Sequence, residues 1–224
     1  MYQHIFNSIT LSLSGRKYFT LIFLLVFFYS LPSLAQYDTL LHKPYSQKVL
    51  GVHAMYKDLI DIGDSVKRAQ KAEEIKAFAR KHDDRGLELE VHFFEIFWNA
   101  FYQQQAKELS HAELKKLVAL VSKENYYFLK ARALRAMAEF YWKIEKNYEL
   151  AFEQYLLLDK ELKNTNPTDY PEMTRDLMQI GEAYYFFQDY SIAINYFKRA
   201  IAIPENSFNT MVINSAKNDL GLCY

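Results

Sequence analysis

The stretch from Thr174 to Ser207 constrains the fold more than any other part of the sequence. Its small and apolar residues recur three and four positions apart over one run and then, after Gln188-Asp189, over a second. They are Leu177, Ile180, Gly181 and Tyr184 in the first run, and Ala193, Phe197 and Ala200 in the second. This spacing places each set on one face of an α-helix, so the segment predicts two antiparallel helices packed face to face.

Residue size gives this pairing a physical basis. Gly181 and the two alanines allow the helix backbones to approach closely, while Tyr184 and Phe197 fill the space beside them. Pro204 is expected to end the second helix. The full series resembles a tetratricopeptide repeat (TPR), and its members are Leu177, Ile180, Gly181, Tyr184, Ala193, Phe197, Ala200 and Pro204. The resemblance implies an all-α protein of antiparallel helix pairs stacked as a right-handed α-solenoid.

A weaker copy of the pattern lies upstream, with one extra residue in its turn. It consists of Leu134, Met137, Ala138 and Tyr141, followed by Ala151, Tyr155 and Leu158. Tyrosines at 102, 141, 184 and 224 stand 39, 43 and 40 residues apart. These gaps exceed the ~34 residues of a standard TPR, so helical arrays of the HEAT type, with ~40 to 47, stay open as an alternative.

Other helices are predicted from pattern alone. The expected segments are 65–81, 86–104 and 111–123, together with a helix that Asp169 caps and in which Pro171 and Glu172 occupy the first turn. Only 6 glycines and 5 prolines occur in 224 residues, against average usages of ~7% and ~5%, which disfavours an all-β fold rich in tight turns. Half of the residues are hydrophobic, enough for a folded core.

Charge argues against a nucleic-acid partner. Lysine plus arginine and aspartate plus glutamate are equal at 27 each, and no basic stripe interrupts the balance. Without such a stripe, this segment offers no concentrated positive charge to bind the phosphate backbone of a nucleic acid.

Residues 1–35 have the layout of a secretory signal peptide. Arg16 and Lys17 precede an apolar run of 14 residues from Tyr18 to Leu31, and Ser33 and Ala35 suit a signal peptidase. We expect cleavage before Gln36 and a periplasmic or other extracytoplasmic location. An uncleaved anchor is the alternative, but a spanning helix needs about 20 apolar residues. Any membrane contact is thus expected only through this segment or through a part downstream of Tyr224.

Three segments are predicted: the signal peptide at 1–35, a lead segment at 36–46, and a TPR-like helical repeat domain at 47–224. Leu220, Gly221 and Tyr224 begin another repeat, so we expect the domain to be incomplete at its C-terminus. A signal peptide followed by TPR-like helices resembles the extracytoplasmic sensor region of bacterial TPR-containing regulators.

No residue set predicts chemistry. The six glycines are too scattered for a phosphate-binding loop. Glu88, His92 and Glu95 share one helical face, but a solvated charged face explains them better than a metal site does. The acids after His82 are expected to cap the following helix. We therefore predict no catalytic residues, no metal and no cofactor.

The TPR resemblance implies an inner groove lined by first-helix residues. They are Arg132, Arg135, Glu139 and Trp142 in one repeat and Arg175, Met178, Glu182 and Tyr185 in the next. In this hypothesis the arginines meet acidic groups of a peptide and the aromatic residues meet its apolar side chains. The alternative is that all eight are ordinary surface residues. Glu139 and Glu182 stand where the carboxylate-clamp subclass has asparagine, which argues against recognition of a free C-terminus.

The leading functional prediction is an exported, non-catalytic scaffold that binds a protein or peptide, as the sensing part of a longer bacterial signalling protein. A structural adaptor in envelope assembly is the second. An α-helical enzyme comes third, since the sequence shows no convergent polar set.

Overall fold

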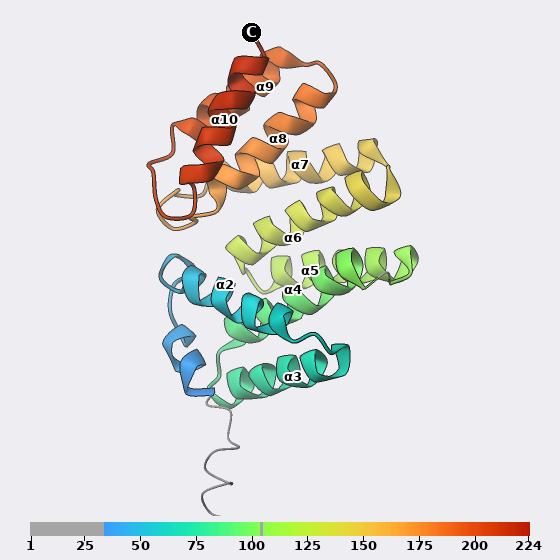
Figure 1. Cartoon of the computed structure of the whole chain (residues 1–224), viewed down its shortest axis with the longest axis vertical. Coiled ribbons are helices and arrows are strands. Elements are labelled where there is room, and N and C mark those ends of the chain that lie inside the picture. Colours follow the sequence, from blue (N-terminus) through green and yellow to red (C-terminus); the bar gives the residue numbers. More distant parts are fainter. Residues whose placement is uncertain (1–33, 104) are drawn as a thin grey trace, which may run out of the picture. The chain divides into compact units, whose positions relative to one another are not determined.

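The computed structural model describes residues 34–103 and 105–224, and helices are its only regular structure there (Figure 1). The chain divides into two compact units, residues 1–38 and 39–224. Of the first unit the description covers residues 34–38, which belong to a 3₁₀ helix, Leu34–Leu40. The predicted signal peptide lies almost wholly outside the described residues and stays a prediction.

The second unit holds the α-helices. They are α2 (Tyr45–Asp61), α3 (Ser65–Lys81), α4 (Arg85–Tyr102), α5 (Lys107–Lys123), α6 (Tyr127–Phe140), α7 (Tyr148–Leu162), α8 (Met173–Phe186), α9 (Tyr190–Ile201) and α10 (Thr210–Leu222). Each of the helices from α3 to α10 packs on the next one along the chain, most extensively in the pairs α6 with α7 and α8 with α9. The all-α prediction is confirmed over the described residues.

The α8–α9 pair packs as its sequence pattern predicts. Its predicted core residues are buried, and Tyr184 is partly buried against the same core. A Cβ built on Gly181 would lie 2.7 Å from the ring of Phe197, so the two helices meet at a distance that only glycine permits at this position. Pro204 is exposed and follows the end of α9 at Ile201.

The α6–α7 pair accommodates its extra residue in a π-helical turn. Helix α6 runs into a turn at Tyr141–Glu145, and the backbone N–H of Asn147 donates to the carbonyl of Tyr141, six residues back. The corresponding bond in the α8–α9 turn, from Asp189 to Tyr184, spans five. One residue inserted at a helix end is the usual origin of a π-turn. The seven residues of the predicted pattern in this pair are all buried.

Short turns with a left-handed residue join four helix pairs. Asp83, Asn125, Lys146 and Gln188 have φ between 53° and 63°, and each directly precedes the N-cap residue of the next helix. The predicted capping by Asp84 is confirmed, because its Oδ1 accepts from the N–H of Leu87 at 2.8 Å.

Several boundaries differ from the predictions. Helix α2 begins at Tyr45, inside the predicted lead segment, and α5 begins four residues before His111. Helix α8 begins at Met173 rather than after Asp169, which is exposed; Glu172 takes the N-cap position with its carboxylate turned inward. At the start of α8, the long-range bond from Tyr45 to Glu172 accompanies the shift away from the local start signal.

The prediction that the last helix begins another repeat stays a prediction. Helix α10 buries Ile213 and Ala216, whereas Gly221 faces open space and Tyr224 is 83% exposed. Tyr102, the first of the regularly spaced tyrosines, is also exposed. The tyrosines at the two ends of the regularly spaced series are thus exposed, whereas Tyr141 is buried and Tyr184 is partly buried.

Candidate functional site

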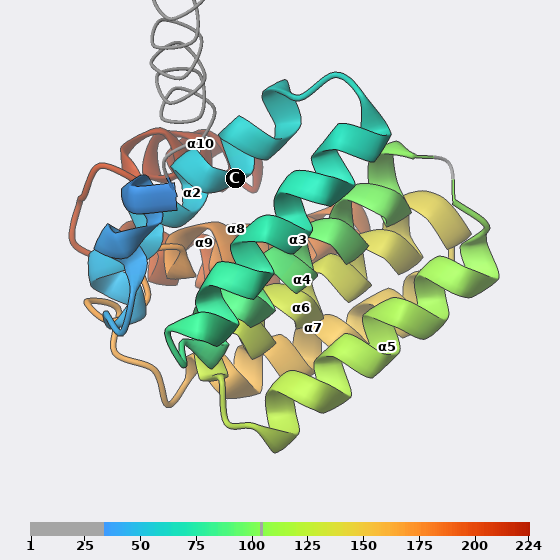
Figure 2. The same cartoon turned by 90° about the horizontal axis from the view of Figure 1, so that it is seen from below.

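Helices α4, α6 and α8 present side chains to α2, and we call this surface the first-helix face. In the view of Figure 2, α2 lies on one side of α4 and α6 while α5 lies on the other. The ring of Tyr56 on α2 packs 5.2 Å from that of Phe94 on α4. The ring of Tyr45 stacks at 5.6 Å on Phe128 of α6. Its hydroxyl donates to Glu172, the N-cap residue of α8. Helix α2 therefore crosses three successive first helices.

The centre of this contact is the guanidinium of Arg132, whose side chain is only 3% exposed. Its Nη1 lies 2.5 Å from Oε2 of Glu90 on α4, and its Nε lies 3.3 Å from Oε2 of Glu172. Its Nη2 donates to the hydroxyl of Tyr56 at 2.9 Å, and that hydroxyl donates to Glu90 at 2.7 Å. A buried charge is tolerated only when it is paired and hydrogen-bonded, and this one is.

A second buried pair lies one helical turn further along α6. Arg135 Nη1 donates to Oδ1 of Asp176 on α8 at 2.7 Å, and the hydroxyl of Tyr170 donates to Oδ2 at 2.8 Å. Burial raises the pKa of Asp176 to about 6, even though Arg135 acts to lower it. Glu172 responds in the opposite direction. Burial acts to raise its pKa, but Arg132, the His53 imidazole 3.3 Å away, and Arg135 together hold it well below the ordinary value.

Two of the predicted groove residues are thus occupied within the chain. Arg132 and Arg135 do point to the first-helix side and do meet carboxylates, but the carboxylates are Glu90, Glu172 and Asp176. With α2 in place Arg132 is buried, so an external peptide cannot reach it in this structure. Sequence periodicity on α6 identified the face but held no information about which distant segment covers it.

Trp142 is partly buried among aromatic side chains of this chain, and its place in a ligand groove stays a prediction. It lies in the π-helical turn and packs among aromatic rings, with centroid distances of 4.9 Å to Tyr148 on α7 and 5.2 Å to Phe186 on α8. Phe186 and its neighbour Phe187 are 57% and 48% exposed.

The remaining predicted residues lie on the part of the face nearer α10. Arg175 and Glu182 are exposed, and Met178 and Tyr185 are partly buried. Glu139 accepts from Lys143 at 2.8 Å and from Gln179 at 2.9 Å. The surroundings of Glu182 desolvate it, and together with Asp219 on α10 they raise its pKa to about 7. This stretch carries one exposed cation, one exposed acid and two half-buried apolar side chains.

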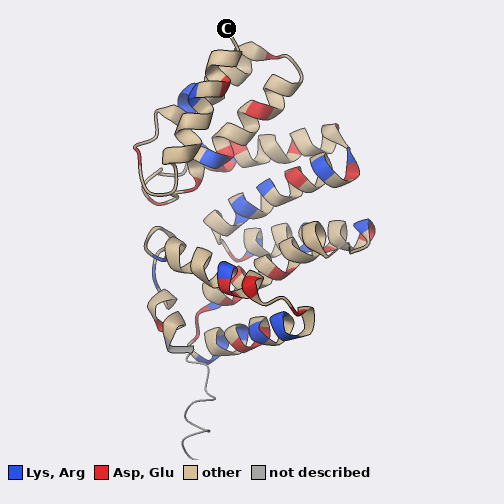
Figure 3. Ribbon diagram, in the orientation of Figure 1, with Lys and Arg blue, Asp and Glu red and all other residues tan. Residues whose placement is uncertain are grey.

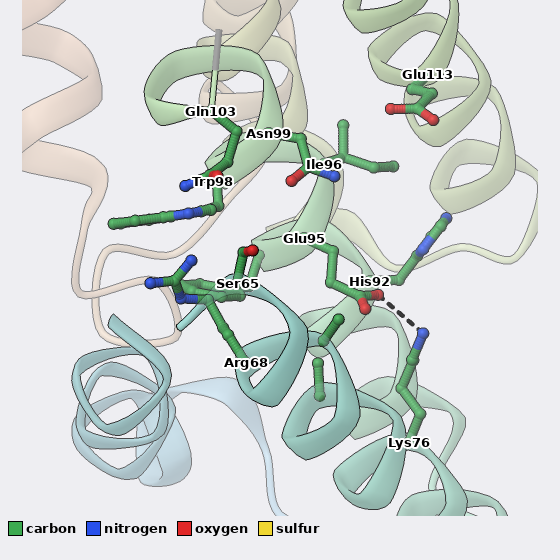
Figure 4. A pocket seen from close by; sticks show the side chains of 13 residues that line it. Ser65, Arg68, Lys76, His92, Glu95, Ile96, Trp98, Asn99, Gln103 and Glu113 are labelled. Atoms are coloured by element: carbon green, nitrogen blue, oxygen red, sulfur yellow. Dashed lines mark hydrogen bonds and ion pairs between the residues drawn. The ribbon is translucent and has the colours of Figure 1, made fainter. Parts of the chain in front are cut away.

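A separate pocket of about 340 Å³ lies between α3 and α4 and was not predicted (Figure 4). The guanidinium of Arg68 sits 4.6 Å from the ring centroid of Trp98, and Lys76 pairs with Glu95 at 2.8 Å. His92 and Glu95 line the pocket. Glu88 does not join them, because Arg80 and Arg85 hold its carboxylate.

Within the described parts of the chain no three His, Cys, Asp or Glu side chains gather closely enough to hold a metal ion. Basic and acidic residues are interspersed along α3 (Figure 3), and Arg80 of α3 bridges Glu73 on the same helix and Glu88 on α4. None of the helices described has the length and apolar character to cross a membrane.

Fold and site together define an all-helical protein of packed helix pairs, with a buried ionic network on one face. A scan against protein-family models finds no match to the chain, and searches of curated proteins and of solved structures find no similar protein.

Proposed function

We propose that this chain is a non-catalytic scaffold of the TPR type whose first-helix face binds a protein or peptide. The single observation that carries the proposal is that this face already holds a helix, α2, by aromatic and ionic contacts from α4, α6 and α8. A surface that seats one amphipathic helix has the shape and chemistry for helix-in-groove recognition.

The repeat pattern supports the finer architecture. The two pairs α6–α7 and α8–α9 bury equivalent residues. The first helices supply Leu134, Met137 and Ala138 in one pair and Leu177, Ile180 and Gly181 in the other. The second helices supply an alanine and an aromatic residue, which are Ala151 with Tyr155 and Ala193 with Phe197. Stacking such pairs with a constant rotation would produce the right-handed solenoid, with the first-helix face as its concave side.

The open part of the face would be the contact surface for an external ligand. Arg175 would pair with an acidic group of the ligand. Its guanidinium lies 3.9 Å from the carboxylate of Glu172, and its side chain is 45% exposed. Met178 and Tyr185 would take apolar side chains. We place the scaffold outside the cytoplasm, in a bacterial signalling protein, on the strength of residues 1–35 and the TPR resemblance.

A display experiment tests the proposal. Random peptides displayed on phage would be selected against the purified chain, and the selected peptides would be measured against two charge reversals. Arg175→Glu lies on the first-helix face, and Lys198→Glu is its matched control at an exposed position of α9. We expect Arg175→Glu to weaken binding at least tenfold and Lys198→Glu to leave it unchanged. Peptides indifferent to Arg175→Glu, or a library that yields no binder, would refute the proposal.

A further inference from the structure

The buried residues of α2 lie along one strip of its surface, and Gly51 beside that strip faces Leu40 of the preceding 3₁₀ helix. These buried residues follow one another at helical spacing, and they are Tyr45, Lys48, Val49, Val52, Met55 and Leu59. The outer side of α2 is open: Leu50 is 64% exposed and Ile60 is 44% exposed. Helix α2 therefore lies against the first-helix face as a bound amphipathic peptide would, with one face in contact and the other in solvent.

Side chains rather than close backbone packing hold α2 there. Among the described helices, only α3 comes near the α2 backbone along several residues. Elsewhere long side chains bridge the gap, chiefly those of Tyr45, Tyr56 and Arg132. A contact built this way is set by side-chain chemistry and can be reproduced by another helix carrying similar side chains.

The ionic partners of Arg132 do not come from α2. Glu90 belongs to α4 and Glu172 precedes α8, so the guanidinium keeps both carboxylates when α2 is absent. Helix α2 adds two tyrosine hydroxyls and His53, whose Nε2 lies 3.3 Å from Glu172. Because removing α2 breaks neither ion pair of Arg132, the face can exchange its occupant without the penalty that breaking those buried pairs would carry.

Both ends of α2 are tethered. At the C-terminal end Arg68 Nε donates to the carbonyl of Leu59 at 3.0 Å, and before the N-terminal end the N–H of His42 donates to Asp84 at 2.6 Å. The link to α3 is the short segment 62–64. Gly63 in this segment is exposed, and a Cβ built on it would have no neighbouring atom within 4 Å. These tethers keep α2 at high local concentration beside its site.

From these observations we infer that α2 is an intramolecular ligand of the first-helix face, and that the external ligand is an amphipathic helix of the same chemistry which displaces it. Counted from its first tyrosine, such a helix carries apolar residues four, seven and ten positions later. A second aromatic residue with a hydrogen-bonding group follows eleven positions after that tyrosine. Helix α2 has this pattern from Tyr45 to Tyr56. The external helix binds only when α2 has left the face. Its apparent affinity is therefore the intrinsic affinity multiplied by the fraction of molecules in which the face is open. The inference rests on the proposed scaffold function and specifies its ligand.

The test uses a fluorescent peptide of residues 44–62 and the full chain. Val52 on α2 is fully buried, so Val52→Asp should release the tethered helix while leaving every residue of the face unchanged. We expect the Val52→Asp chain to bind the wild-type peptide at least tenfold more tightly than the wild-type chain does. A peptide that itself carries Val52→Asp should not bind. Equal, absent or non-selective binding by a Val52→Asp chain that keeps its helical circular dichroism would overturn the inference.

Hydrogen exchange on the wild-type chain covers the case in which the variant does not fold. A displaceable α2 must open without global unfolding, so its amides should exchange faster than those of α6 and α8 and with a weaker dependence on denaturant. Protection of α2 equal to that of α6 would overturn the inference. If phage-selected peptides respond to Arg175→Glu while the α2 peptide never binds, the scaffold proposal stands and only the role of α2 falls.

Discussion

Gly181 is the residue through which α8 and α9 approach closely. The ideal Cβ position is 2.7 Å and 2.9 Å from two ring carbons of Phe197, and that ring is fully buried in the core. A side chain at this position must therefore displace the ring or separate α8 from α9.

Replacing Gly181 by leucine should destabilise the fold by about 1–3 kcal/mol or more, because overpacking forces off-rotamer side chains and backbone shifts. Urea denaturation followed by circular dichroism measures the change. The matched control is Gly221→Leu in α10, where nothing lies within 4 Å of the new Cβ. Similar stabilities for the two variants would show that α8 and α9 do not approach through Gly181.

At the scale of the elements, the four short turns that join the helix pairs contain no glycine. Each turn places a residue with a side chain in the left-handed region, where most L-residues are disfavoured because Cβ crowds the backbone carbonyl. The N-cap side chains that follow, Asp84, Asn147 and Asp189, bond the first turn of the next helix and fix where it begins.

Gln188→Gly should stabilise the protein by roughly 0.5–1 kcal/mol, since glycine adopts φ near 63° without the steric cost. Gln188 is exposed, so the substitution removes no core contact. Lys198→Gly on the exposed side of α9 is the contrasting variant and should lose about 1 kcal/mol through helix propensity. Thermal melting of both variants measures the difference, and a loss of stability in Gln188→Gly would contradict the backbone geometry described for this turn.

At the scale of the whole molecule, the buried network joins segments more than a hundred residues apart. Glu172 accepts from Tyr45 across 127 positions and pairs with Arg132, so the network links α2, α6 and the start of α8. The folded state lowers the pKa of Glu172, whose ionised form therefore stabilises the fold above the ordinary pKa of about 4.5. That contribution is lost as the pH falls through the lower, folded-state pKa.

The stability difference between wild type and Glu172→Gln should therefore be largest near pH 7 and shrink below pH 4.5. Asp176→Asn supplies the opposite case. The pKa of Asp176 is raised from 3.8 to about 6, so the wild type should gain stability relative to this variant as the pH falls from above 6 toward 3.8. Melting temperatures measured from pH 7.5 to 3.5 test both signs. Differences that move in the same direction would contradict the network.

The sequence alone determined the helical class, the two best-matched helix pairs and several helix ends. Leu177, Gly181 and Phe197 lie close enough along the chain for helical periodicity to place them on facing surfaces, and Asp84 caps a helix through a bond three residues long. Such features depend on local spacing, which a sequence shows directly.

Tertiary structure alone decided what covers the first-helix face. Periodicity placed Arg132 and Arg135 on that face but could not indicate that Glu90, Asp176 and the tyrosines of α2 would meet them. Those hydrogen bonds join residues 41 to 76 positions apart. The physical reason is that long-range pairing depends on how whole helices stack and on the balance between burial and charge, neither of which is encoded in the spacing of residues along one helix.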